Sequence, residues 1–388
     1  MHHLFHRKGG FNYFILKVKV LFIVNNIYLD TSKKEGGVRN CTQEYIDLLS
    51  TRFDVILFPV SYSKTIMYRF RSKIGFNNYN DYTTKVYQNE LRNIITKNAI
   101  KLVFLNLSNT MTFASVIKEK FNQVKVVLCS HGNESGDFLH QIFRFKQGQN
   151  WLQRVKNSIL FAKMIEKEVD FRLRFLDLVL TVSEVEEGVE KWLGAKRVFM
   201  VPRVLKNEPI RWNPQYGRVG FLGDLSHKPN YDGVVTFCDA IVKSGNKDLK
   251  LRLLGNPESI GNQLANEYPF VEYCGFVSDD KIKEEVATWS LFLNLVFYYS
   301  RGVSTKLAKG LSWGIPVLST TYGNRGYAIP SGMLISAETP AEMAELAIKL
   351  NSDRNKLETM RNTSLRLSSE CNDFGPIMDK LLPLISNF

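Results

Sequence analysis

The chain has 388 residues, of which 44% are hydrophobic and 23% are charged, and these globular values exclude wholesale disorder and fibrous folds. This length has room for two domains, each able to bury its own core. The net charge of +13 fits nucleic acid, an anionic membrane surface or phosphorylated substrates as partners. Because no zinc-finger or RNP-type motif accompanies the charge, nucleic acid is not an expected partner.

The five cysteines are scattered, and their spacing indicates neither a metal site nor a disulfide framework, which favours a reducing cytoplasm. The apolar run from Phe14 to Tyr28 is interrupted by two lysines and two asparagines, so we predict a buried strand rather than a membrane span. Residues 1–15 contain three histidines and are expected to form a disordered leader, with metal binding as the alternative.

Strands and helices are predicted to alternate through the first half. The apolar run Val18–Asn25 is typical of the centre of a parallel sheet, and a loop with Gly36 and Gly37 leads to a predicted helix over 38–53. Strand, glycine loop and helix in this order can cradle a phosphate, although an ordinary tight turn explains the Gly–Gly pair more simply. Further strands are predicted over 54–60, 102–106, 125–129, 178–182 and 197–202.

Two segments of this half are basic and aromatic. Residues 61–87 predict an amphipathic surface segment that rests on anionic lipid headgroups, with a solvated loop as the alternative. Residues 138–176 predict one long helical region of similar composition. Between them, His131 follows a buried strand and precedes a glycine, so it is placed either to face an inter-domain cleft or to serve as a turn or core histidine.

Residues 206–217 contain two prolines and little periodicity, and we predict a linker there. A second alternating series follows, and its most informative stretch is 291–327. A strand over 291–297 leads through a polar elbow to a helix over 306–313, for which Ser304 and Thr305 are good N-cap residues. The helix N-terminus, with Arg301 and Lys306 beside it, predicts an anion site such as a phosphate site.

The order of these motifs resembles the GT-B glycosyltransferases, especially the retaining, nucleotide-sugar-dependent enzymes of family 4. The resemblance covers nearly the whole chain from about Val18 and is clearer in the C-terminal half. It is carried by these stretches in the family's order: Gly36–Arg39, Asp177–Glu184, Gly220–Gly223, Pro229–Gly233, Leu253–Gly255, Gly275–Val277 and Gly302–Val317.

The resemblance implies an α/β fold of the GT-B type, with two Rossmann-like domains facing a central cleft. The N-terminal acceptor-side domain would comprise residues 16–205 and the C-terminal donor domain residues 218–370. Residues 371–388 would form a helix that crosses back to the first domain. Such enzymes need no bound metal and no cofactor, because basic side chains and helix N-termini neutralise the leaving diphosphate of the nucleotide-sugar co-substrate.

The resemblance also assigns residues. Lys306 would contact the donor diphosphate, with Arg301 stabilising the leaving group and His131 near the sugar and the reacting centre. The remaining donor-binding positions are Gly36, Gly37, Gly223, Ser226, His227, Lys228, Gly255, Phe276, Val277, Gly302, Val303, Ser304, Thr305 and Lys309.

One departure is informative: the family commonly carries two glutamates spaced Glu-x7-Glu, and here Arg301 and Lys309 stand in their places. We expect an active variant, a hexosyltransferase-type enzyme of glycan or polysaccharide biosynthesis. Its partners would be a nucleotide sugar, a glycan or lipid-linked acceptor and an anionic membrane surface at the cytoplasmic face. The alternatives are a non-catalytic GT-B module that binds a glycan or a partner transferase, and a nucleotide-sugar epimerase of the same fold.

Overall fold

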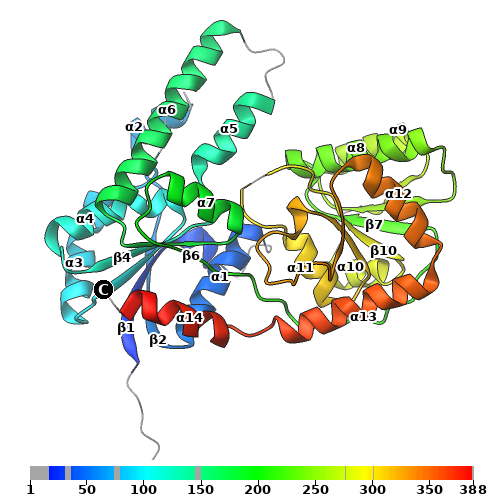
Figure 1. The fold of residues 1–388 in the computed structure, drawn as a ribbon. Coiled ribbons are helices and arrows are strands. Elements are labelled where there is room, and N and C mark those ends of the chain that lie inside the picture. Colours follow the sequence, from blue (N-terminus) through cyan, green and yellow to red (C-terminus); the bar gives the residue numbers. More distant parts are fainter. Residues whose placement is uncertain are drawn as a thin grey trace, which may run out of the picture.

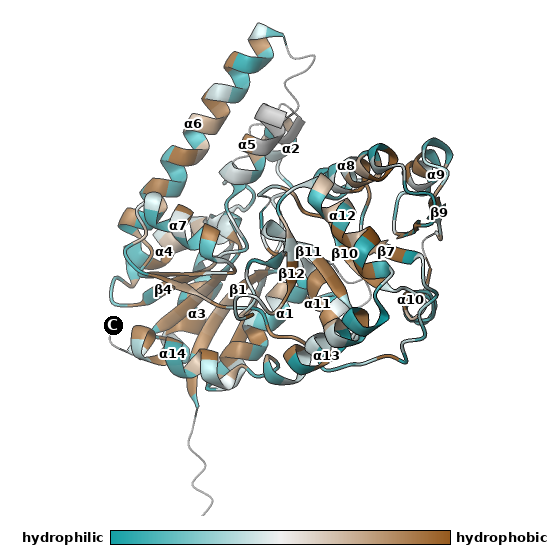
Figure 2. Cartoon of the chain, turned by 45° about the vertical axis from the view of Figure 1, so that its right-hand side comes forward, coloured by the Kyte–Doolittle hydropathy of each residue, from teal (hydrophilic) through white to brown (hydrophobic). Residues whose placement is uncertain are grey.

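The computed structural model describes residues 17–30, 36–73, 79–144, 150–275, 277–299 and 301–386. The expected leader and Phe276 lie outside these residues. The described chain forms two α/β domains that lie side by side (Figure 1), and each is built on a six-stranded parallel sheet. Both sheets are hydrophobic, whereas the outer faces of the surrounding helices are largely hydrophilic (Figure 2).

The N-terminal sheet has the strand order β2-β1-β3-β4-β5-β6. Helices cover both faces of its central strands, and this explains the continuous apolar runs that the sequence shows there. The strands are β1 (Val18–Asn25), β2 (Phe53–Val60), β3 (Leu102–Asn106), β4 (Lys125–Cys129), β5 (Leu178–Thr181) and β6 (Val198–Met200). The helices are η1 (Asn26–Tyr28), α1 (Gly37–Ser50), α2 (Ile66–Lys73), η2 (Thr84–Tyr87), α3 (Gln88–Lys97), η3 (Ser108–Met111), α4 (Thr112–Lys120), α5 (Glu134–Arg144), α6 (Trp151–Arg174) and α7 (Glu184–Trp192).

The C-terminal sheet has the order β12-β11-β10-β7-β8-β9. Its strands are β7 (Arg218–Leu222), β8 (Lys250–Leu254), β9 (Val271–Tyr273), β10 (Leu291–Asn294), β11 (Val317–Thr320) and β12 (Ile335–Ala337). Its helices are α8 (Lys228–Ser244), α9 (Glu258–Glu267), α10 (Asp279–Val286), α11 (Thr305–Ser312), η4 (Tyr322–Asn324), α12 (Pro340–Asn351) and α13 (Arg354–Glu370).

The last helix, α14 (Gly375–Ser386), lies against the N-terminal domain, although α13 before it belongs to the C-terminal one (Figure 1). Its Met378, Leu381 and Ile385 are buried in the same core cluster as Phe22 and Leu48 of the first domain. The chain therefore ties its two domains together twice, once through the segment after β6 and once through α14.

The structure corrects the single helical region predicted over 138–176, because it contains two helices, α5 and α6. The second helix starts at a capping box: Gln153 N donates to Asn150 Oδ1 at 2.9 Å, and Asn150 N donates to Gln153 Oε1 at 3.2 Å. This reciprocal pair satisfies N–H groups at a new helix start and so fixes where α6 begins.

A buried ion pair holds α6 to α7 in the N-terminal domain. Arg172 and Glu190 have fully buried side chains and pair through the Arg172 Nε atom, and Arg172 Nη2 also donates to Glu190 Oε1 at 2.8 Å. A second contact of Nη2, to Asn133 Oδ1 at 2.5 Å, ties the pair to the loop after β4. Removing one member would leave a buried charge without its partner.

We expect Arg172→Met to destabilise the protein by about 3–5 kcal/mol in urea unfolding, because Glu190 would keep a buried charge. The matched control is Arg174→Met, which removes the exposed pair with Asp170 on the same helix and should cost less than about 1 kcal/mol. Equal effects of the two substitutions would contradict the importance of the buried pair.

Candidate functional site

A cavity of about 470 Å³ lies between the two domains. Loops that follow β4 and β5 of the first sheet and β7, β10 and β11 of the second contribute to its walls, so it lies where carboxyl ends of parallel strands face each other. Its lining residues are Gly37, Val38, Cys41, His131, Asp137, Val182, Arg203, Gly223, Asp224, His227, Pro229, Asn230, Val296, Arg301, Gly302, Val303, Ser304, Thr305, Lys306 and Arg325.

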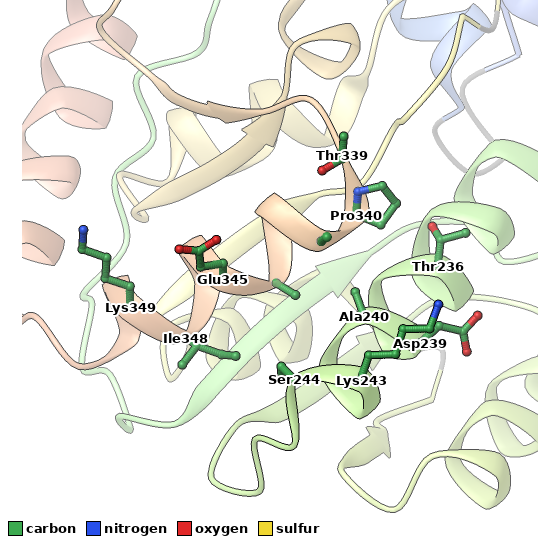
Figure 3. A pocket seen from close by; sticks show the side chains of 12 residues that line it. Thr236, Asp239, Ala240, Lys243, Ser244, Thr339, Pro340, Glu345, Ile348 and Lys349 are labelled. Atoms are coloured by element: carbon green, nitrogen blue, oxygen red, sulfur yellow. The ribbon is translucent and has the colours of Figure 1, made fainter.

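A larger hollow of about 790 Å³ lies between α8 and α12 (Figure 3), and its described lining shares no residue with that of the inter-domain cavity. Asp239 and Lys243 stand on the α8 wall, and Glu345 and Lys349 on the α12 wall. Its described lining contains no glycine, and although it includes the start of α12, Thr339 already caps that helix by accepting a hydrogen bond from Glu342 N at 3.2 Å. We therefore take the inter-domain cavity as the candidate site.

The start of α11 forms one wall of this cavity. Ser304 stands at the N-cap, but its hydroxyl donates to Asn294 Oδ1 at 2.7 Å and makes no capping bond. Ser304 is thus the N-cap residue by position, as predicted, but its side chain makes no capping hydrogen bond and bonds to Asn294 instead. Gly302 has a φ of +77°, which glycine adopts readily, and the turn there directs the helix N-terminus at the cavity. The partial positive charge of that terminus favours an anion.

Lys306 contributes the ammonium group nearest this helix start. Its Nζ donates to Asn230 Oδ1 at 2.8 Å and lies 5.7 Å from the centre of the Phe221 ring. Asn230 Nδ2 donates to the Asp224 carbonyl at 2.7 Å, so the amide presents its oxygen to the lysine. Burial, reinforced by the charge of Arg325, lowers the pKa of Lys306 to about 8. The ammonium is thus charged at neutral pH while bonded to a neutral amide.

Arg301 lines the cavity but spans the cleft. Its Nη1 lies 2.5 Å from Glu134 Oε1 and its Nε lies 2.8 Å from Asp137 Oδ2, both on α5 of the N-terminal domain. Burial opposes the charge, but the two carboxylates raise the pKa of Arg301. Gly132 makes room for this side chain, since a Cβ there would lie 2.2 Å from Arg301 Cγ. The guanidinium therefore bridges the domains.

His131 is buried on the opposite wall, and a chain of hydrogen bonds sets its tautomer. The Thr42 hydroxyl donates to the Val38 carbonyl at 2.8 Å, so it accepts from Asn106 Nδ2 at 2.9 Å. Asn106 Oδ1 then lies 3.0 Å from His131 Nε2 and accepts a hydrogen bond from its N–H group. Burial, followed by the charges of Arg301 and Arg203, lowers the pKa of His131 to about 3. The ring is neutral, with Nδ1 as its acceptor.

The structure brings together ten of the predicted site residues on the cavity lining: Gly37, His131, Gly223, His227, Arg301, Gly302, Val303, Ser304, Thr305 and Lys306. Six others do not line it: Gly36, Ser226, Lys228, Gly255, Val277 and Lys309. Lys309 instead places its ammonium 5.6 Å from the centre of the Trp313 ring. Gly255 packs against the backbone of Gly223, which lines the cavity, and only a glycine fits there because a Cβ would lie 1.8 Å from the Gly223 carbonyl oxygen.

Two basic residues on the lining, Arg203 and Arg325, were not predicted from the sequence. Arg203 makes a two-pronged contact with Glu44, and Arg325 donates to the carbonyls of Tyr322 and Gly302. Both follow strands of a parallel sheet, and polar residues in that position are the signal that would have found them.

Among the described residues, no group of three or more His, Cys, Asp or Glu side chains is placed to hold a metal ion.

Solved structures share this architecture along nearly the whole chain. HepE from Anabaena, solved with UDP and glucose, has 14% identity and a TM-score of 0.62, covering 96% of this chain and all of its own. Sucrose-phosphate synthase from Thermosynechococcus elongatus has 12% identity and a TM-score of 0.67, covering 96% and 99%. A glycosyltransferase from Rickettsia africae ESF-5 has 13% identity and a TM-score of 0.61, covering 96% and 98%.

Two parallel sheets around a shared cleft define a GT-B protein, which confirms the fold class expected from the sequence. Residues 217–353 match the family model described as Glycosyl transferases group 1. The chain thus has the fold of the GT-B glycosyltransferases, and its C-terminal domain is similar to the group 1 glycosyl transferases. A comparison with proteins of curated function finds no match to this sequence.

The neutral state of His131 can be checked by histidine NMR. We expect its ring to appear as the Nε2–H tautomer at pH 7 and to stay neutral down to about pH 4, because burial lowers its pKa to about 3. His131→Gln would identify the signal by its loss. A ring that titrates near pH 6.5, or that carries its proton on Nδ1, would contradict this assignment.

Proposed function

We propose that this chain is a hexosyltransferase that moves a sugar from a nucleotide-sugar donor, with retention, onto a glycan or lipid-linked acceptor. The observation that carries the proposal is the convergence of Lys306 and the α11 N-terminus on one cavity whose walls come from both domains. A diphosphate requires this combination of a cation and directed N–H groups. The solved complexes of HepE with UDP-glucose support a nucleotide sugar as the donor.

In the proposed reaction, an acceptor hydroxyl oxygen forms a bond to the anomeric carbon as the bond from that carbon to the diphosphate oxygen breaks. The electron pair of the broken bond leaves with the nucleoside diphosphate, and the hydroxyl proton passes to a diphosphate oxygen. Negative charge thus grows on the diphosphate in the transition state. Lys306 and the first turn of α11 lie where they would stabilise it without a bound metal.

The two other predicted catalytic residues have different roles in this proposal. His131 is neutral with Nε2 engaged, so it would accept a hydrogen bond from a donor-sugar hydroxyl at Nδ1 rather than transfer a proton. Arg301 is held by two carboxylates, so it would position the Gly302 loop more than neutralise the leaving group. Stabilisation of the negative charge that grows on the diphosphate is then provided mainly by Lys306.

The non-catalytic alternative has one specific observation in its favour. Cations occupy both positions where family 4 commonly carries glutamates, one of which would bind the ribose of the nucleotide. Here Arg301 pairs with α5, and Lys309 lies against the Trp313 ring. A module of that kind would bind a glycan or a partner transferase but no nucleotide. Nucleotide binding at Lys306 therefore separates the two functions.

We also propose that the protein acts at an anionic membrane surface on the cytoplasmic side. Three apolar side chains of α2 are more than half exposed, at 86% for Ile66, 58% for Met67 and 60% for Phe70. Trp151 and Leu152 at the start of α6 are also largely exposed, and basic residues lie next to both groups. Exposed apolar residues beside lysines and arginines are typical of helices that lie in the headgroup region. No described helix combines the length and hydrophobicity that crossing a membrane requires.

Nucleoside diphosphate binding tests the donor site. We expect calorimetry with UDP, GDP and ADP to find a ligand whose affinity falls as pH rises through about 8, because Lys306 then loses its proton. Lys306→Met should weaken that ligand at least about tenfold, since it loses a hydrogen bond to a charged group. Lys306→Arg should bind without the pH dependence, and Lys309→Met should bind like the wild type. Absence of nucleotide binding would overturn the transferase function.

Vesicle co-sedimentation tests the membrane surface. We expect binding to vesicles rich in phosphatidylserine, lost in high salt because the attraction is largely electrostatic. Phe70→Asp and Trp151→Asp should weaken it several-fold, whereas Trp192→Asp, which changes an equally exposed tryptophan on α7, should not. Vesicle binding that is unchanged by high salt, or no vesicle binding at all, would count against the proposal.

A further inference from the structure

A second cavity of about 310 Å³ opens in the N-terminal domain next to the donor site. The two cavities share Val38 and Arg301 on their linings, so these residues form the boundary between them. The lining consists of Tyr28, Val38, Tyr62, Tyr79, Asp81, Leu107, Asn109, Glu134, Met164 and Arg301. Its volume is at the small end of the range of roughly 300–1,000 Å³ for ligand pockets, which fits one sugar ring rather than an extended chain.

The chemistry of this lining suits a ring that carries hydroxyl groups. Tyr28 and Tyr62 hydrogen-bond to each other, and both residues line the cavity. Asp81 and Glu134 add carboxylate oxygens, which accept hydrogen bonds from hydroxyls. Tyrosine rings supply apolar faces for the C–H groups of a sugar. Flat apolar surfaces beside acceptor oxygens match a pyranose, which has apolar C–H faces and hydroxyl groups around its edge.

The charges on the lining disfavour an anion. Among the described residues that line it, Arg301 is the single cation, and it already pairs with Glu134 and with Asp137. A phosphate or carboxylate in this cavity would therefore meet Asp81 and Glu134 without a lining cation left to pair with it. A neutral ligand incurs no such repulsion, because its hydroxyls donate to the same carboxylates.

Buried contacts hold the shape of this cavity before any ligand arrives. Tyr79 donates its hydroxyl to Glu168 of α6, and Ser135 donates its N–H to the same carboxylate at 3.1 Å and its hydroxyl at 2.5 Å. Ser135 follows Glu134 in the first turn of α5, so Glu168 fixes both sides of the cavity. Tyr79 and Leu107 also have positive φ values of 56° and 73°, and such strain in residues with side chains gathers at ligand sites.

We propose that this cavity is the acceptor subsite and that it binds a neutral, hydroxyl-rich sugar unit through Asp81, Glu134 and the tyrosine pair Tyr28 and Tyr62. This assignment rests on the proposed transferase function. The acceptor hydroxyl would enter past Arg301, from the N-terminal domain side, toward a donor sugar held beside His131. An acceptor whose attacking unit carries a phosphate or a carboxylate would be rejected at this subsite.

The test measures binding of methyl glycosides by saturation-transfer NMR and titration, with nucleoside diphosphate present. The panel contains methyl glucoside, galactoside and mannoside, together with the matching uronic acids and 6-phosphates. We expect a neutral glycoside to bind more tightly than its anionic counterparts. Asp81→Asn should weaken it about tenfold, as loss of a hydrogen bond to a charged group does, and Tyr28→Leu should weaken it about threefold to tenfold, as loss of a neutral hydrogen bond does. Nucleotide affinity should stay within about twofold of wild type in both.

Asp54→Asn is the matched control, because it removes an exposed carboxylate of the same domain on β2 and should leave glycoside binding unchanged. Unchanged melting temperatures would show that Asp81→Asn and Tyr28→Leu fold normally. Tighter binding of the anionic sugars would overturn the inference, as would no glycoside binding or equal binding by Asp81→Asn and wild type. If glycosides bind in this way but no nucleotide binds, the sugar subsite stands and the transferase function fails.

Discussion

The loop at Gly302, which carries the start of α11, is held in place by a buried carboxylate of the other domain. Glu186, at the start of α7, is fully buried and accepts the backbone N–H of Gly302 at 2.7 Å. Burial raises the pKa of Glu186 to about 7, with the Gly302 N–H bond opposing that rise. The turn that directs α11 at the cavity therefore depends on the N-terminal domain being docked. Gly326 repeats the arrangement, because its backbone N–H donates to Glu184 Oε2 at 3.3 Å, and its carbonyl also accepts from Arg203 N at 2.9 Å.

This docking explains why a cation can occupy position 301. The carboxylates that the family commonly has on this loop are absent, but Glu134 and Asp137 approach the same point from α5. The carboxylates near position 301 thus come from α5 of the N-terminal domain, and the cation comes from the C-terminal domain. Among the described residues, Lys306 hydrogen-bonds only to a neutral amide, so a diphosphate bound as proposed would not have to displace a carboxylate from it. An arginine in place of the family's glutamate at position 301 is therefore compatible with the proposed donor site.

Sequence patterns located the elements better than the contacts between them. Strands such as Val18–Asn25 were predictable because burial on both faces produces continuous apolar runs. The cavity position of Lys306 was also predictable, since a residue in the first turn of a helix after a strand stays near the sheet edge. The partners of Arg301 were not, because Glu134 is 167 positions away along the chain and no local pattern links them. The Lys309 contact with Trp313 likewise depends on side-chain direction.

The same ion pairs limit how tightly the cleft is closed. The side chains of Arg301, Glu134 and Asp137 are 25–35% exposed, so solvent screens their attraction and each pair contributes nearer about 1 kcal/mol than the several kcal/mol of a buried pair. Domain separation would break both pairs and open both cavities, because Arg301 lines each of them. The glycine at 132 lets this guanidinium reach α5 at all. A single side chain thus forms part of the wall of both the inter-domain cavity and the neighbouring one, and the ion pairs that hold it are weak enough to break at a small free-energy cost.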